Sequence, residues 1–107
     1  MEEITVHQLK EKKENRDAFF LLDVRETFEY YISKIDGSTV IPVDELLSRL
    51  DELEDKKDKE IIVMCRTGSR SAQAQKMLLN NGFKNVKNLK GGINQWAREI
   101  DNSLPLY

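Results

Sequence analysis

One stretch, residues 60–71, constrains the fold of this chain more than any other, because it predicts a strand, a tight loop and a helix in direct succession. Residues 61–64 are apolar and mostly β-branched, which is typical of a fully buried strand. The strand ends at Cys65, the only cysteine, and residues 66–70 form a short loop, here called the cysteine loop. A helical pattern follows over residues 71–81. Such a succession directs several backbone N–H groups at one point.

The charges around Cys65 are those of an anion-binding site that holds a nucleophile. The dipole of the following helix adds partial positive charge to the loop, and Arg66 and Arg70 flank it. Such surroundings favour the thiolate, the reactive form of cysteine. A cysteine at the end of a buried strand is more often only a small apolar core residue, but two arginines beside a structural thiol have no packing purpose. We therefore predict that Cys65 is a nucleophile.

Strands and helices alternate along the whole chain, which predicts an α/β fold with a mainly parallel sheet. With 107 residues, the chain is long enough for one domain over residues 1–107 with a single modest core. The expected strands are residues 3–5, 18–24, 38–41, 61–64 and 83–89. The expected helices are residues 6–13, 25–32, 44–53, 71–81 and 93–99, and an irregular tail follows over residues 101–107.

A second group of polar side chains is expected at the same edge of the sheet as the cysteine loop. In parallel sheets, ligands bind outside the carboxyl ends of the strands. Cys65 ends one strand and Asp23 ends another, so both lie at that edge. We expect Asp23 to anchor loops through backbone N–H groups or an arginine, and Arg25 to pair with an acidic neighbour or shape the site. Both are therefore supporting residues.

Composition excludes several classes of function. The formal net charge of −2 argues against nucleic-acid and membrane-surface partners, since neither polyanion would attract the chain. A single cysteine cannot form an internal disulfide, and the sequence has no Cys/His cluster for zinc. The acidic start is unlike a signal peptide, and no segment approaches the roughly 20 apolar residues that span a bilayer. The sequence predicts a soluble, cytoplasmic domain without a metal.

The chain resembles a single-domain rhodanese, a family of sulfurtransferases, along nearly its whole length. Four segments carry the resemblance: residues 21–26 with 28–30, residues 35–38 with 41–42, residues 63–72, and residues 89–93 with Trp96. Each is weak alone, and all four occur in the family's order. The turn before Gly37 departs from the family, because Ser33 and Lys34 replace the usual Gly-His, and Ser38 replaces a common alanine. The resemblance implies a rhodanese-like sheet of about five strands with helices on both faces.

The resemblance also implies a double displacement. The Cys65 thiolate would take the outer sulfur of thiosulfate or a polysulfide, and a thiol or cyanide would then remove it. Arg66 and Arg70 would bind the donor's oxygens, and the N–H groups of residues 66–70 would surround the transferred sulfur. Gly68 would allow the tight curvature of the loop, and the hydroxyls of Thr67 and Ser69 would add donors. No metal or organic cofactor is implied, and a sulfur-relay protein is a further candidate partner.

Two alternatives stay open at this point. The chain could be a noncatalytic module that uses the fold to carry sulfur or to dock a partner. It could also be a cysteine phosphatase, whose loop likewise places an arginine behind a thiolate. Protein phosphatases have five residues between the two, whereas four separate Cys65 from Arg70 here. A cysteine protease is disfavoured, because the only histidine, His7, lies outside every matching segment.

Overall fold

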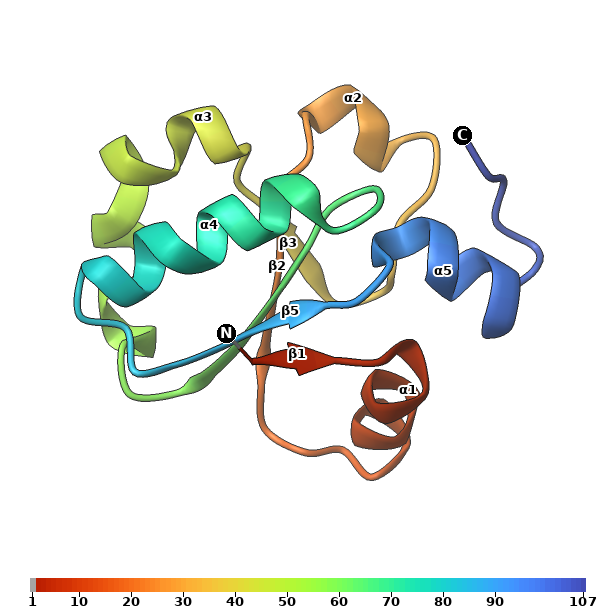
Figure 1. Cartoon of the computed structure of the whole chain (residues 1–107), viewed down its shortest axis with the longest axis horizontal. Helices are drawn as coiled ribbons and strands as arrows, with labels where there is room; N and C mark the ends of the chain where they lie inside the picture. Colours follow the sequence, from red (N-terminus) through yellow and green to blue (C-terminus); the bar gives the residue numbers. More distant parts are fainter. Residues whose placement is uncertain (1) are drawn as a thin grey trace.

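A five-stranded parallel sheet organises the computed structural model, which describes residues 2–107 (Figure 1). The strands lie in the order β1-β5-β4-β2-β3, and all four neighbouring pairs are parallel. Their bounds are β1 Glu3–Ile4, β2 Phe20–Asp23, β3 Ser38–Val40, β4 Glu60–Met64 and β5 Asn85–Leu89. The predicted α/β class and parallel sheet are confirmed.

Helices cover both faces of the sheet. They are α1 Val6–Glu14, α2 Thr27–Tyr30, α3 Val43–Leu46, the 3-10 helix η1 Leu47–Lys56, α4 Ser69–Asn80 and α5 Gly92–Glu99. One apolar core contains residues of α3, η1 and α4, and a second contains residues of α1 and α5. Ile61 and Val63 of β4 belong to the first core, whereas Ile62 and Met64 belong to the second. This two-sided burial explains why the strand reads as a continuous apolar run.

Three predicted helices differ from the structure by two residues or more at an end, or in their geometry. The helix predicted over residues 44–53 is divided into α3 and a second part, the 3-10 helix η1, and the backbone at Arg49 (φ −121°, ψ 17°) interrupts η1. Leu47, at the start of that second part, is 57% exposed. Helix α2 is shorter than predicted, and Phe28 is 67% exposed. Helix α4 begins two residues earlier than predicted, at Ser69, so its first two residues also belong to the cysteine loop.

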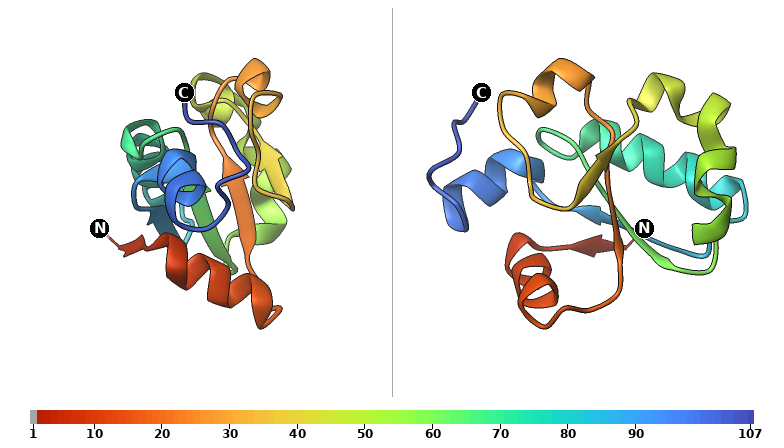
Figure 2. Two further views of the ribbon diagram at one scale, coloured as in Figure 1. Left: turned by 90° about the vertical axis from the view of Figure 1, so that its right-hand side faces the viewer. Right: turned by 180° about the vertical axis from the view of Figure 1, so that it is seen from behind.

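The carboxyl ends of β2 and β4 lie side by side and position the candidate site. The two strands pair in a register that sets Asp23 opposite Met64, and the N–H of Val24 donates to the Met64 carbonyl at 2.9 Å. The segment before Arg25 and the cysteine loop therefore leave the sheet at the same edge, as expected. Figures 1 and 2 show the end of the chain returning to this edge beside α2.

Within residues 2–107, none of the helices is both long enough and apolar enough to cross a membrane.

Candidate active site

Cys65 lies at the base of the cysteine loop, on the α4 side of the sheet. Side chains alternate along β4, and Cys65 continues the series of Ile61 and Val63 into the core that α4 covers. Its side chain is buried, at 1% exposure. The Gly68 N–H donates to Sγ at 3.1 Å, and the Ser71 hydroxyl lies 3.3 Å from it. The thiol therefore faces the loop and the first turn of α4.

The Ser71 hydroxyl has two acceptors and a single proton. It lies 2.5 Å from Oδ1 of Asn88 and 3.3 Å from Sγ of Cys65. Asn88 also donates through Nδ2 to the Gly68 carbonyl at 3.0 Å, which sets its amide so that Oδ1 faces Ser71. Asn88 thus links β5 to the loop and competes with the sulfur for the Ser71 proton.

Backbone N–H groups at the start of α5 bind the backbone at Cys65 and the first residue of the cysteine loop. The Cys65 and Arg66 carbonyls accept hydrogen bonds from the N–H groups of Ile93 at 2.9 Å and Asn94 at 3.1 Å. Gly92 makes this close approach possible, because a Cβ there would lie 2.4 Å from the Arg66 oxygen. The Cys65 carbonyl and the first carbonyl of the cysteine loop are therefore fixed to α5, and this restrains the peptides that follow.

The cysteine loop contains backbone donors that have no acceptor. Within residues 2–107, the N–H groups of Arg66, Thr67, Ser69 and Arg70 take part in no hydrogen bond, and that of Gly68 goes to Sγ. The dipole of α4, a 12-residue helix, adds partial positive charge at the same place. Unpartnered amides in a concave loop form a cradle for an anion or an electron-rich atom. The loop can therefore stabilise negative charge close to Sγ.

Arg70 points to a carboxylate and not to open solvent. Its two terminal nitrogens donate to Glu29 at 2.7 and 2.9 Å, in a bidentate pair with a side chain that is 7% exposed. This pair lowers the pKa of Glu29 to about 2 and raises the pKa of Arg70. The charge of Arg70 is thus balanced within the protein. Its expected part in substrate binding stays a prediction.

Arg66 is exposed, and its guanidinium carbon lies 4.9 Å from the centroid of the Tyr107 ring. Thr67 and Ser69 are exposed at the same loop. The structure therefore brings the predicted loop residues together around Cys65. Their roles in binding a substrate stay predictions.

Asp23 and Arg25 form a fully buried ion pair. Arg25 Nη2 donates to Asp23 Oδ2 at 2.7 Å, and the Arg25 N–H donates to Oδ1 at 3.1 Å. Arg25 also donates to the carbonyls of Glu29 at 3.3 Å and Ser33 at 2.8 Å. Burial opposes the charge of Arg25, but the bonds to Asp23 and Tyr107 outweigh it and raise its pKa. The pair fastens α2 and the following turn to the end of β2.

Sequence reasoning assigned no site role to Glu29, Ser71, Asn88, Gly92 or Tyr107. Glu29, Ser71 and Gly92 lie in segments that carry the family resemblance, and that resemblance could have indicated them. Tyr107 lies in an irregular tail and gave no signal. In the described part of the chain, no group of three or more His, Cys, Asp or Glu side chains is arranged to hold a metal ion.

The family described as Rhodanese-like domain matches residues 5–99. The adenylyltransferase and sulfurtransferase UBA4 of Meyerozyma guilliermondii is 39% identical over 93 residues, which is 81% of this chain and 22% of UBA4. The chain thus spans about a fifth of the length of that relative.

Two solved structures share the fold. The crystal structure of SSP1007 from Staphylococcus saprophyticus aligns with a TM-score of 0.83 and 33% identity, over 94% of this chain and 97% of that one. An NAD-dependent persulfide reductase from A. fulgidus aligns with a TM-score of 0.70 and 38% identity, over 90% of this chain but only 16% of the reductase.

Proposed function

The chain belongs to the rhodanese-like domain family, and on that premise we propose that it moves sulfane sulfur from an anionic donor to a thiol through a persulfide on Cys65. Relatives named sulfurtransferase and persulfide reductase support sulfur chemistry at the level of the family. The observation that carries the proposal is the set of four unpartnered amides that follows Cys65 within residues 2–107. They supply donors where a sulfur bound to Sγ would carry negative charge.

The first step forms the persulfide. A lone pair of the Cys65 thiolate attacks the outer sulfur of thiosulfate and forms a new S–S bond. The bond between the two sulfurs of thiosulfate breaks, and sulfite leaves with its electron pair. Cys65 then carries one additional sulfur with a negative charge. The four free N–H groups of the cysteine loop can donate hydrogen bonds to this charged sulfur without rearrangement, because the α5 amides already hold the Cys65 and Arg66 carbonyls.

The second step returns the cysteine to its starting state. An acceptor thiolate attacks the outer sulfur, the Cys65 thiolate leaves, and the acceptor becomes the persulfide. With cyanide, the product is thiocyanate. Because Cys65 is 1% exposed, the acceptor must project its thiol into the loop. A small thiol or a cysteine on a protruding segment of a relay protein meets this condition.

The size of the loop favours sulfur over a phosphoryl group. Four residues separate Cys65 from Arg70, and Arg70 already pairs with Glu29. A phosphoryl group needs donors for three equatorial oxygens, whereas a persulfide presents one atom. This supports a sulfurtransferase over a cysteine phosphatase.

Intact-mass measurement tests the proposal. Reduced protein is incubated with thiosulfate, and its mass is measured before and after treatment with a dithiol or cyanide. We expect a gain of one sulfur that the acceptor removes, and no gain in Cys65→Ser, whose transfer rate should fall by about three orders of magnitude or more. Arg98→Ala, at an exposed position of α5, serves as the control and should behave like the wild type.

Other outcomes identify the alternatives. A gain only from a protein persulfide donor would indicate a relay carrier. No gain from any donor would contradict the proposal and favour a docking module. Hydrolysis of an aryl phosphate by the wild type but not by Cys65→Ser would favour a phosphatase.

A further inference from the structure

We propose that Tyr107 is a specificity-determining residue that holds Arg66 over the cysteine loop as a cation that no carboxylate of residues 2–107 balances, so that the loop favours anionic reactants. The inference deepens the proposed function and rests on it for its biological meaning. Tyr107 lies far from Cys65 along the chain, in a tail without regular structure, yet its hydroxyl, ring and main-chain oxygen each contact the site. These three parts do different things.

The hydroxyl of Tyr107 connects two ion pairs through hydrogen bonds. It accepts a hydrogen bond from Arg25 Nη1 at 2.8 Å and donates to Glu29 Oε1 at 2.9 Å. Glu29 in turn receives both terminal nitrogens of Arg70. Burial raises the pKa of Tyr107, so the hydroxyl keeps its proton and remains a donor to Glu29. The hydroxyl therefore helps to hold Glu29 on Arg70.

Counting the side-chain carboxylates and guanidinium groups in this chain of contacts leaves one guanidinium without a carboxylate. Asp23 pairs with Arg25, and Glu29 pairs with Arg70. Two carboxylates thus balance two guanidinium groups. Within residues 2–107, Arg66 has no carboxylate partner, although it belongs to the same loop. The attraction of an anion to the mouth of the loop therefore depends on where the Arg66 guanidinium is held.

The ring of Tyr107 holds that guanidinium. The Arg66 guanidinium carbon lies 4.9 Å from the ring centroid, at the distance of a cation–π contact. Such stacking restrains a planar guanidinium and leaves its N–H donors available at the edges. An anionic reactant can then meet a cation whose position is already set.

Asn94 connects the C-terminal tail to the cysteine loop and so restrains the Tyr107 ring relative to Arg66. The Asn94 side chain donates to the main-chain oxygen of Tyr107 at 3.0 Å, and its backbone N–H donates to the Arg66 carbonyl at 3.1 Å. Asn94 is 5% exposed and lies in the first turn of α5. One buried residue thus binds the backbone of both stacking partners.

The test uses two alkylating reagents of similar size but different charge. Iodoacetate is an anion, iodoacetamide is neutral, and both modify Cys65, the only cysteine. The ratio of their second-order rates reports the electrostatic potential at the loop. Four variants are compared with the wild type: Tyr107→Leu, Tyr107→Phe, Arg66→Ala, and the double variant that combines Arg66→Ala with Tyr107→Leu. Tyr31→Leu, at an 82% exposed tyrosine, is the matched control.

We expect Tyr107→Leu to lower the iodoacetate rate about threefold to fivefold, equivalent to ~1 kcal/mol of lost cation–π stacking, with little change for iodoacetamide. Arg66→Ala should lower the ratio at least as much, and Tyr107→Leu should have no further effect in that background. Tyr107→Phe keeps the ring and should retain the ratio within about twofold. Tyr31→Leu should match the wild type.

Three results would overturn the inference: an unchanged ratio in Tyr107→Leu, an equal fall in both rates, or a further fall in the Arg66→Ala background. Unfolding is recognised separately, because it exposes Cys65 and raises both rates. The alkylation ratio requires no sulfur transfer. If Tyr107→Leu leaves the rate ratio unchanged while the wild type forms the persulfide, only the role of Tyr107 is refuted. If Tyr107→Leu changes the ratio as expected but the wild type forms no persulfide, only the proposed function is refuted.

Discussion

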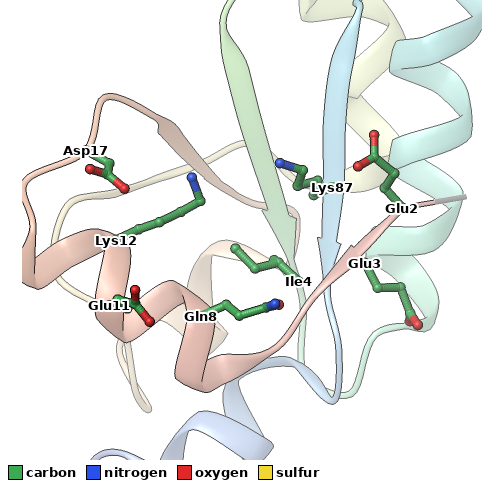
Figure 3. A pocket seen from close by; sticks show the side chains of 8 residues that line it. All are labelled: Glu2, Glu3, Ile4, Gln8, Glu11, Lys12, Asp17 and Lys87. Carbon is green, nitrogen blue, oxygen red and sulfur yellow. The ribbon is translucent and has the colours of Figure 1, made fainter.

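Two charged regions lie toward opposite ends of the same sheet, and only one has the features of a reactive site. A hollow of about 480 Å³ lies between α1, β1 and β5, here called the amino-edge hollow, and its lining includes Glu11, Lys12, Asp17 and Lys87 (Figure 3). The cysteine loop lies toward the carboxyl ends of the strands and presents fewer charged side chains. By the number of its charged side chains alone, the amino-edge hollow would be the better candidate.

The difference is in which polar groups already have partners. Figure 3 shows Lys12 and Lys87 extending toward one another from α1 and β5, and both bind Glu60, at 2.7 and 2.5 Å. The two cations of the amino-edge hollow are therefore satisfied within the protein. The cysteine loop instead has four backbone donors for which residues 2–107 supply no acceptor. Unpaired N–H groups at the start of a helix, beside a buried thiol, can bind an anion there.

The largest effect on the loop is expected from Gly92→Ala. Gly92 has φ +61°, and a Cβ would lie 2.4 Å from the Arg66 oxygen and 2.5 Å from the Cys65 oxygen. Strain and clash together should cost about 3 kcal/mol of stability and displace the loop. Urea unfolding and persulfide formation measure both effects.

Gly37→Ala is the matched control for this change. Gly37 has φ +87°, but a Cβ there would meet no atom within 4 Å, so only the backbone strain remains. We expect a cost of about 1–2 kcal/mol and normal sulfur transfer. Equal losses in both variants would show that the contact between Gly92 and the loop is unimportant.

Glu29→Gln should remove a pH-dependent part of the stability. The folded pKa of Glu29 is about 2 against an ordinary value of 4.5, so its contribution is fully present above pH 4.5 and is lost as pH falls toward 2. The shift corresponds to about 3 kcal/mol. The free energy of unfolding of wild type and variant should thus differ most above about pH 5 and converge near about pH 2.

An exposed carboxylate provides the comparison for Glu29. Glu54 is 65% exposed and pairs with Lys57 at the surface, so Glu54→Gln should change stability by no more than about 0.5 kcal/mol. A wild-type advantage over Glu29→Gln that stays constant from about pH 7 to about pH 2 would contradict the buried pair as its cause.

A moderate effect is expected when the free cation of the loop is removed. Arg66→Ala should raise KM for thiosulfate about tenfold, because a charged hydrogen bond contributes about 1.5 kcal/mol. The turnover number should change less, since the amides of the loop remain. Steady-state kinetics against Arg98→Ala measure this. A larger rise in KM for Arg70→Ala would show that Arg70 leaves Glu29 to bind the donor.

The smallest effect is expected in the amino-edge hollow. Lys12→Ala removes one of the two cations on Glu60, so stability should fall by at most about 1 kcal/mol. Sulfur transfer should stay within about twofold of the wild type, because Glu60 begins β4 and Cys65 follows its other end. A tenfold loss of transfer with normal stability would mean that the hollow takes part in the reaction.

The sequence predicts the framework of the site more completely than its charge network. The continuous apolar run of residues 61–64 predicts a strand buried on both faces of a parallel sheet, which the structure confirms, and it places Cys65 directly after that strand. The contact between Glu29 and Arg70 spans 41 positions, and that between Glu29 and Tyr107 spans 78. Such pairs depend on how α2, α4 and the tail pack against one another, and the periodicity of the sequence does not predict that packing.

Helix geometry between residues 43 and 56 was also beyond the sequence pattern. Leu47, Leu50 and Leu53 recur every three residues, a spacing that places them on one side of either a short α-helix or a 3-10 helix. The interruption at Arg49 therefore leaves no trace in the spacing of the leucines, although Leu47 is exposed while Leu46 and Leu53 are buried.

Amide hydrogen exchange in the cysteine loop tests the central claim most directly. Exchange is measured residue by residue in reduced protein and in protein carrying one additional sulfur on Cys65. If the persulfide binds the free donors, exchange at residues 66, 67, 69 and 70 should slow by about tenfold, while exchange at Lys12 and Lys87 stays unchanged. Unchanged exchange at all four loop amides, in protein whose mass confirms the added sulfur, would contradict the account.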